Sequence, residues 1–364
     1  MSGAPLVRGL ALSERYYQEA VRPILESRFP GLEHSAALLG QGSEVLGFDT
    51  AQSMDHDWGL RLMLFLAEGD HSAVSEAIHG HLQNELPDEF CGFPTRFVLS
   101  PARAEEGNVS EAARHQVTLL TVRGFFLQVL GFDPLGPIGV ADWLSVPEQN
   151  LLSVTSGAVF HDGLGQLEAV RSRLHYYPRD VWLYLLAAQW RRMAQEEHFV
   201  GRCGQVGDEL GSRLIASRLV QDLMRLGFLM ERRYAPYIKW LGTAFAQLSC
   251  AKRLGPILLE VLRASTWPER EKHLGAAYEL MAGLHNALGI TQPLPIAVTP
   301  FWDRPFQIIH GDRFVDAIRA AIQDPEVRAL PEHLGSVDQF VDSTDALRYL
   351  DRLKVAYQDP DAVC

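Results

Sequence analysis

The sequence of 364 residues has few cysteines, fewer cationic than anionic side chains and no long apolar run. Its four cysteines (Cys91, Cys203, Cys250 and Cys364) are widely scattered and form no Cys-x-x-Cys pair. We therefore expect free thiols in a reducing compartment. Lysine and arginine number 33 against 45 aspartates and glutamates, which gives a formal net charge of -12. This balance disfavours a broad nucleic-acid surface, although it is compatible with a local basic patch.

Targeting and membrane signals are also missing from the sequence. No apolar stretch approaches the roughly 20 residues that a membrane-spanning helix needs. The opening segment, MSGAPLVRGLALSERYYQEA, carries charged side chains too early for a signal peptide. We therefore expect a cytoplasmic protein with no membrane partner.

What the sequence does contain is apolar patterning of two kinds, over a length that accommodates two domains. In the first part of the chain, short apolar runs rich in branched and aromatic residues predict strands, and four-residue apolar spacing predicts helices. The predicted strands cover residues 34–40, 55–66, 95–100 and 115–122, and the predicted helices cover residues 11–28 and 70–86.

Beyond about residue 140 the patterning is helical. Six apolar residues recur at three- to five-residue spacing: Leu210, Leu214, Leu219, Leu223, Leu226 and Met230. Pro236 stands where a further helix begins, and residues 268–289 predict another long helix. A stretch rich in Gly and Pro, residues 130–149, is the expected boundary. We therefore predict an α+β protein, with a small mixed-sheet domain over residues 1–140 and a larger all-helical domain over residues 141–364.

One stretch of the first domain carries candidate chemistry. Gly42-Ser43 follows an apolar run, and Asp55-His56-Asp57 opens the next one. In a strand, Asp55 and Asp57 would point to the same face, with Cα atoms roughly 6.6 Å apart. Such carboxylates repel each other unless a cation lies between them, and their oxygens suit Mg²⁺. Gly42 would let a phosphate approach the backbone, and Ser43 would offer a hydroxyl beside N–H groups.

This stretch resembles the signature of the DNA polymerase beta-like nucleotidyltransferases, in which Gly-Ser and Asp-x-Asp are separated by about ten residues. Here eleven residues separate them. The chain also resembles the small-molecule and antibiotic nucleotidyltransferases and the DUF4037 family, through GFDTAQSMDHDWG, LGFDP and ERRYAPYIKWLGTAF. The resemblance implies that Asp55 and Asp57 bind Mg²⁺ or Mn²⁺, that Gly42 and Ser43 bind the phosphates of a nucleoside triphosphate, and that a substrate hydroxyl attacks its α-phosphorus.

The sequence departs from that pattern at three places. His56 stands between the aspartates, where an apolar residue is usual, and Glu44 and Val45 follow Gly-Ser in place of a small residue and an arginine. A third carboxylate is expected on a neighbouring strand, where the sequence offers only Gln116 or Thr118. An active enzyme would then need a base from the helical domain.

The helical half supplies two further candidates. Tyr237-Ile238-Lys239-Trp240 matches a patch whose lysine reaches the nucleotide phosphates in small nucleotidyltransferases. The alternative is that Lys239 is an ordinary solvated surface side chain. Glu209 is the candidate for the missing base. Alternatively, its negative charge only interacts favourably with the dipole at the start of a helix.

The acidic composition favours a small-molecule acceptor over a nucleic acid, while transfer to RNA or to a protein remains an alternative. A further alternative is a catalytically degenerate fold that binds nucleotide as a sensor or interaction protein. Turnover of labelled triphosphate separates the enzyme from the sensor.

Overall fold

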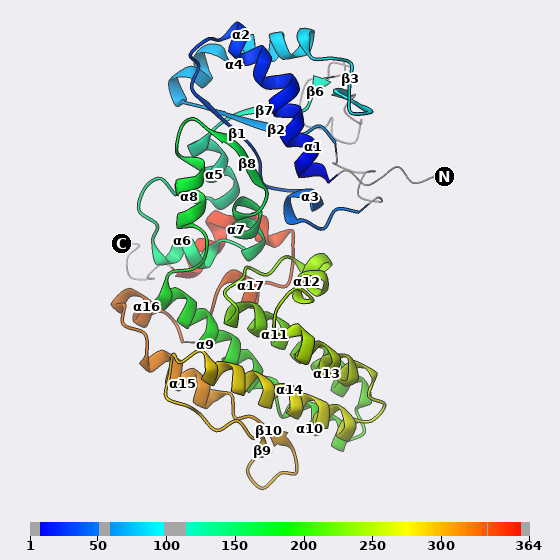
Figure 1. Ribbon diagram of the computed structural model, residues 1–364. Helices are drawn as coiled ribbons and strands as arrows, with labels where there is room; N and C mark the ends of the chain where they lie inside the picture. The colour runs from blue at the N-terminus through cyan, green and yellow to red at the C-terminus, as the bar shows by residue number, and fades with distance from the viewer. Residues whose placement is uncertain (1–7, 51–58, 98–113, 333, 358–364) are drawn as a thin grey trace. The chain divides into compact units, whose positions relative to one another are not determined.

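The computed structural model describes residues 8–50, 59–97, 114–332 and 334–357. The chain forms two compact units. The first unit comprises Met1–Pro137 and Asn150–His175, and the second comprises Ile138–Gln149 and Tyr176–Cys364. The predicted fold class is confirmed, because an N-terminal mixed sheet with a few helices is followed by a larger helical region (Figure 1).

The first unit is built on a four-stranded sheet with the order β7-β2-β1-β8. Strand β1 is antiparallel to both β2 and β8, whereas β2 is parallel to β7. A parallel connection needs a crossover, and helix α4 supplies it between β2 and β7. The strands are β1 (His34–Leu38), β2 (Leu62–Leu66), β7 (Val117–Thr121) and β8 (Ala158–Asp162).

Sequence patterning explains the two central strands. All five residues of β1 are buried, as expected for a strand covered on both faces. In β2, alternate side chains point to opposite faces of the sheet. Leu62 and Leu64 join the main core cluster of the unit, whereas Phe65 packs against Phe125 of α5, with ring centroids 5.5 Å apart.

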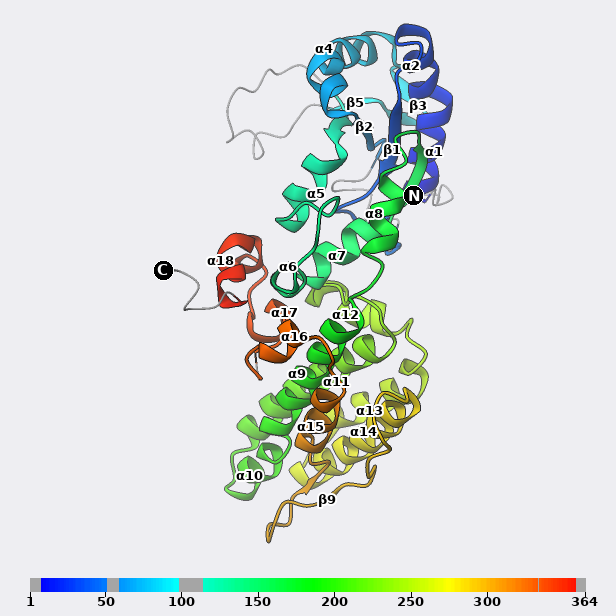
Figure 2. The same cartoon turned by 90° about the vertical axis from the view of Figure 1, so that its left-hand side faces the viewer.

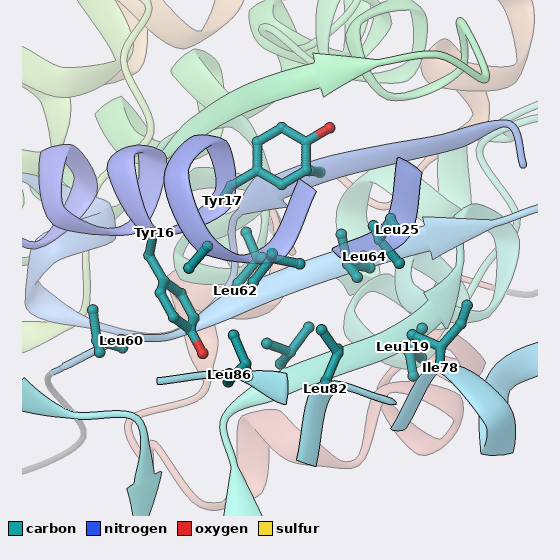
Figure 3. Close-up of a cluster of buried hydrophobic side chains, with 14 of the residues drawn as sticks. Tyr16, Tyr17, Leu25, Leu60, Leu62, Leu64, Ile78, Leu82, Leu86 and Leu119 are labelled. Atoms are coloured by element: carbon teal, nitrogen blue, oxygen red, sulfur yellow. The ribbon is translucent and has the colours of Figure 1, made fainter. Parts of the chain in front are cut away.

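The helices of the first unit cover this sheet. They are α1 (Gly9–Tyr16), a π-helical turn (Tyr17–Val21), α2 (Arg22–Arg28), α3 (Ser43–Leu46), α4 (Glu68–Glu85), α5 (Val122–Leu130), most of α7 (Glu148–Thr155) and α8 (Leu167–Arg173). Figure 3 shows the core on one face, where Tyr16 and Leu25 meet Leu62 and Leu64 of β2 and Leu82 of α4. Each such leucine contributes about 2 kcal/mol by burial.

The strand predictions hold in part. The strand expected over residues 55–66 is found at Leu62–Leu66, whereas residues 59–61 are not part of it, Gly59 having a φ of 146°, and residues 55–58 lie outside the described residues. The strand expected over residues 95–100 is found at Arg96–Phe97, and residues 98–100 lie outside the described residues. Strand β8 lies inside the half that the pattern predicts to be helical, and it completes the sheet.

The second unit is mainly helical, as predicted. Its helices are α6 (Val140–Ser145), α9 (Arg179–Glu196), α10 (Phe199–Gln205), α11 (Glu209–Met230), α12 (Ile238–Phe245), α13 (Ala251–Arg263), α14 (Trp267–Ala287), α15 (Asp312–Ala320), α16 (Pro325–Ala329), α17 (Val337–Phe340) and α18 (Leu350–Lys354). The long helices α11, α13 and α14 lie side by side in both views (Figures 1 and 2).

Short elements complete the described residues. In the first unit the two-residue pairs are β3 (Glu89–Phe90) with β4 (Phe93–Pro94) and β5 (Arg96–Phe97) with β6 (Arg114–His115). In the second unit β9 (Thr299–Pro300) pairs with β10 (Gln307–Ile308), and 3₁₀ turns cover Ala346–Arg348 and Val355–Tyr357. Cys91, Cys203 and Cys250 are free thiols, as predicted. None of the helices in the described part of the chain is long and apolar enough to span a membrane.

Candidate functional site

The Gly-Ser turn follows the end of β1. Gly40 and Gly42 have φ angles of 84° and 139°, conformations that residues with a Cβ rarely adopt. Ser43 then begins the four-residue helix α3, and it is half-buried. The glycines thus let the chain reverse within a few residues and present Ser43 at the start of a helical turn.

The turn is held in place by a distant part of the sequence. The N–H of Gly40 donates to the carbonyl of Ser153 at 2.9 Å, and the N–H of Gly157 donates to the carbonyl of Val45 at 2.9 Å. Strand β8 follows Gly157 directly and pairs with β1. The segment from Ser153 to β8 therefore braces both sides of the Gly-Ser turn.

An ion pair links the turn to the beginning of β2. Arg61 Nη1 donates to Glu44 Oε1 at 2.8 Å, and Arg61 Nη2 donates to the carbonyl of Gln41 at 2.9 Å. Glu44 is buried, with only 3% of its side chain exposed. In the sequence no arginine directly follows Gly42-Ser43, where the family signature usually has one. In the fold, Arg61 reaches the same turn from the residues that precede β2. Arg61 was missed in the sequence, although it is the one charged residue within the apolar run LRLMLFL.

Glu44 also explains the need for glycine at position 42. A Cβ at Gly42 would lie 2.6 Å from Glu44 Oε2, so a larger residue would displace this carboxylate. Burial raises the pKa of Glu44, and the positive charge of Arg61 opposes that rise. The turn therefore encloses a carboxyl–guanidinium pair that fixes its shape.

Asp55, His56 and Asp57 lie outside the described residues. The chain is described again from Gly59, and Arg61 and β2 follow. Nearby Asp49 accepts a hydrogen bond from the N–H of Gly9 at 3.0 Å and so binds the start of α1.

The position expected for a third carboxylate is occupied by uncharged side chains. Thr118 is exposed on β7 and lies opposite Met63 of β2. Gln116 precedes β7 and uses its carbonyl to accept a hydrogen bond from the N–H of Leu62 at 3.3 Å. Neither β2 nor β7 contains an acidic residue. Across the described residues, no group of three or more His, Cys, Asp or Glu side chains could hold a metal ion.

Lys239 lies in the second unit, in the first turn of α12. Its side chain is exposed, and Nζ lies 5.1 Å from the centre of the Trp240 ring. The N–H of Tyr237 donates to Gln149 Oε1 at 3.0 Å, which fixes the chain just before this helix. Gly42 and Ser43 lie in the first unit, so a site shared by these residues and Lys239 stays a prediction.

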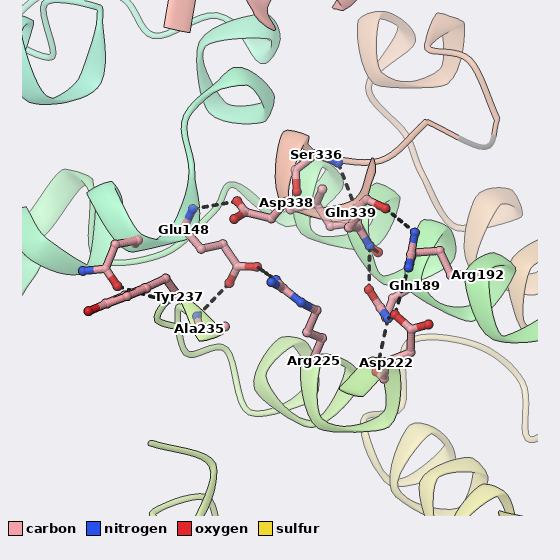
Figure 4. A network of polar contacts seen from close by, with 12 residues as sticks. Glu148, Gln189, Arg192, Asp222, Arg225, Ala235, Tyr237, Ser336, Asp338 and Gln339 are labelled. Carbon is pink, nitrogen blue, oxygen red and sulfur yellow. Dashed lines mark hydrogen bonds and ion pairs between the residues drawn. The ribbon is translucent and has the colours of Figure 1, made fainter. Parts of the chain in front are cut away.

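Two residues before Tyr237, the chain is fixed by the buried carboxyl of Glu148 (Figure 4). Glu148 Oε2 accepts a hydrogen bond from the N–H of Ala235 at 2.8 Å, and Asp338 Oδ2 accepts one from the N–H of Glu148 at 2.8 Å. Arg225 Nη1 lies 3.7 Å from Glu148 Oε1. Burial and the negative charge of Asp338 raise the pKa of Glu148 to about 7. Sequence reasoning missed this residue, because a single acid after a proline carries no motif.

Glu209 begins α11, in the second unit, as the sequence predicts. It forms ion pairs with Arg270, which is buried, and with Arg213 at 3.1 Å. The hydrogen bond from Arg270 is the main cause that lowers the pKa of Glu209. A carboxylate held by two guanidinium groups is a weak base. The geometry therefore supports a structural role, and the role of Glu209 as the base stays a prediction.

Comparison with known proteins gives one partial match. A family model described as "Domain of unknown function (DUF4037)" matches residues 143–241. The matched part includes Glu148, Glu209 and Lys239 and does not reach the Gly-Ser turn. Searches of the curated proteins and of the solved structures found no match.

Proposed function

We propose that the protein is a Mg²⁺-dependent nucleotidyltransferase, which transfers a nucleoside monophosphate from a nucleoside triphosphate to a hydroxyl group. The observation that carries the proposal is the Gly42-Ser43 turn between two adjacent sheet strands, β1 and β2. The Glu44–Arg61 pair ties this turn to the residues that directly follow the aspartate pair. The order strand, Gly-Ser turn, strand is the order that surrounds the Gly-Ser and Asp-x-Asp signature in the family that the sequence resembles.

The donor chemistry of the chain fits the proposed metal. Asp55 and Asp57 supply two carboxylates, a number that suits Mg²⁺ when water and substrate phosphate complete its shell. The metal would neutralise charge on the triphosphate. Ser43 would donate its hydroxyl hydrogen to a phosphate oxygen, and the absence of a Cβ at Gly42 would let the phosphate approach the backbone. Lys239 would add positive charge to the same triphosphate.

The proposed reaction forms one bond and breaks one bond. The acceptor hydroxyl oxygen attacks the α-phosphorus, the bond from that phosphorus to the bridging α–β oxygen breaks, and pyrophosphate leaves with the electron pair. The hydroxyl proton passes to a carboxylate. Positioning and charge neutralisation supply most of the acceleration in such transfers. The acidic net charge favours a small-molecule acceptor over a nucleic acid.

The absence of an acidic residue from β2 and β7 favours a second candidate, a nucleotide-binding sensor without turnover. Transfer needs a group that accepts the hydroxyl proton, whereas binding does not. The same experiment therefore separates the two candidates.

The test is incubation of the protein with α-labelled nucleoside triphosphates, Mg²⁺ and a panel of aminoglycosides, lincosamides and tRNA. We expect pyrophosphate release and label on one acceptor. Asp55→Asn and Asp57→Asn should each abolish turnover, because both side chains serve the cation. Glu76→Gln, which changes an exposed acid on α4, is the matched control and should turn over normally. Tight nucleotide binding with no transfer to any acceptor would favour the sensor, and retained metal-dependent turnover in either Asn variant would refute the assignment.

A further inference from the structure

A pocket of about 430 Å³ opens between helices α11, α13 and α14 of the second unit, and its volume lies within the range of small-molecule sites. Helix α11 contributes Met230, and α14 contributes Leu280 and Leu284. Gly227 of α11 leaves room beside the thiol of Cys250, because a Cβ there would lie 3.1 Å from Sγ. The body of the pocket is therefore mainly apolar.

Two charged residues line the pocket, and they differ in whether the rest of the protein already binds their charged groups. Glu231 is engaged, since its carboxylate accepts hydrogen bonds from the N–H of Ser249 at 2.8 Å and from the N–H of Cys250 at 2.7 Å. Although burial opposes the effect, these bonds hold the pKa of Glu231 below its usual value. The exposed guanidinium of Arg253 has no ion-pair or hydrogen-bond partner within the part of the chain that the structure describes. Of the two charged groups in the lining, the carboxylate is therefore already held by backbone N–H groups, and the guanidinium of Arg253 is the one without a partner among the described residues.

The remaining reactive group does not favour covalent chemistry. Burial raises the pKa of the Cys250 thiol to about 12, so it stays protonated at neutral pH and is a poor nucleophile. A ligand would thus be held by apolar contact and by one charge.

We propose that this pocket binds a small organic anion, with its apolar body between α11 and α14 and its carboxylate beside Arg253. Burial of the apolar body supplies most of the affinity, and a charge-assisted hydrogen bond from the guanidinium selects the anion over a neutral molecule of the same size. This inference does not depend on the nucleotide site, because the pocket lining and the variants include none of the residues proposed for that site.

The test compares decanoate, 2-naphthoate and the neutral decan-1-ol by calorimetry. We expect saturable binding of at least one acid, weaker binding of the alcohol, and a shift of the Met230 methyl resonance in protein with labelled methionine. Decanoate alone would indicate a chain-like ligand, and 2-naphthoate alone an aromatic one. Loss of an interaction of this kind typically costs about tenfold in affinity, so Arg253→Gln should weaken the acid by that factor and leave the alcohol unchanged.

Two further variants complete the design. Arg263→Gln removes an exposed arginine at the other end of α13 and should change nothing. Leu284→Trp should fill the pocket and abolish binding of all probes, and Ala287→Trp, at an exposed position of the lining, gives a second filling variant should the first fail to fold. The proposal is overturned if neither acid binds below about 1 mM. It is equally overturned if the alcohol binds as tightly as the acid, or if Arg253→Gln weakens acid and alcohol alike.

Discussion

At the scale of single residues, Arg61 and Glu148 each stabilise a segment that carries candidate site residues. Arg61 joins the Gly-Ser turn to the beginning of β2, and Glu148 fixes the chain that leads to Lys239. Both residues carry a charged group that is buried or half-buried, and removing that group would leave the charge of its ion-pair partner unpaired. Their effects are therefore measurable as changes in stability before any activity is known.

Replacement of Arg61 by Met should lower the free energy of unfolding by about 2 kcal/mol, because it leaves the carboxyl of Glu44 buried and unpaired. Urea unfolding measures this change. Arg15→Met removes the exposed partner of Glu19 and, as the control, should cost at most about 0.5 kcal/mol. The double variant with Glu44→Gln should recover part of the loss, and an Arg61→Met protein as stable as the unmodified one would refute the role of this pair.

Glu148 should make stability depend on pH in a defined direction. Its pKa is about 7 in the folded protein, whereas an exposed glutamate has a pKa near 4.3, so folding favours the protonated form. This contribution is fully present below about pH 4.3 and is lost as the pH rises towards about 7. Glu148→Gln stays neutral and can still accept the hydrogen bond from Ala235.

The measurement is the free energy of unfolding of both proteins at pH 5 and pH 8. The free energy of unfolding of Glu148→Gln, taken relative to that of the unmodified protein, should rise by on the order of 1–3 kcal/mol from pH 5 to pH 8. Glu197 and Glu271, whose pKa values burial raises to about 7, titrate in both proteins and cancel in the comparison. Asp338→Asn removes the neighbouring negative charge and should move the Glu148 transition to lower pH. An equal difference at both pH values would contradict this account.

At the scale of elements, β8 is the strand that completes the sheet and braces the candidate turn. It begins directly after Gly157, which has φ of 72° and approaches β1 closely. A Cβ at this glycine would lie 2.1 Å from the carbonyl oxygen of Leu38. Position 157 therefore needs glycine both for its conformation and for the space beside β1.

Gly157→Ala should destabilise the first unit by about 3 kcal/mol or more, since strain and displacement of β1 add together. Gly165→Ala is the matched control, because Gly165 also has a positive φ, 66°, but has no atom within 4 Å of the added Cβ. It should cost about 1–2 kcal/mol from strain alone. If chemical unfolding gave equal losses of unfolding free energy for the two variants, the close contact between position 157 and β1 would not contribute to stability.

At the scale of the whole molecule, local patterns predicted the two kinds of architecture but not the contacts between distant segments. The apolar run of β1 and the spacing in α11 are readable from neighbouring residues. Spacing did not predict burial, since Leu210 and Leu214 of α11 are 71% and 59% exposed. Strand β8 was missed because its five residues, AVFHD, are too short and mixed to signal a strand without their partner β1.

The candidate site shows the same limit. Gly42 and Ser43 were found because their chemistry depends on adjacent residues, and the structure places them in a turn at the end of β1. Arg61 was missed because it acts on Glu44, seventeen positions away. The spacing of a motif reports the residues that meet a ligand, whereas the residues that hold them in place depend on the fold.

The central claim is that the Gly-Ser turn and the aspartate pair bind a metal–nucleoside triphosphate complex. Calorimetric titration with ATP and the other nucleoside triphosphates, with and without Mg²⁺, tests it most directly. We expect saturable, Mg²⁺-dependent binding of at least one nucleotide. Asp57→Asn should abolish this binding, Ser43→Ala should weaken it about tenfold, and Glu76→Gln should leave it unchanged. Failure to bind any nucleoside triphosphate in the presence of Mg²⁺, or unchanged binding after Asp57→Asn, would contradict the account.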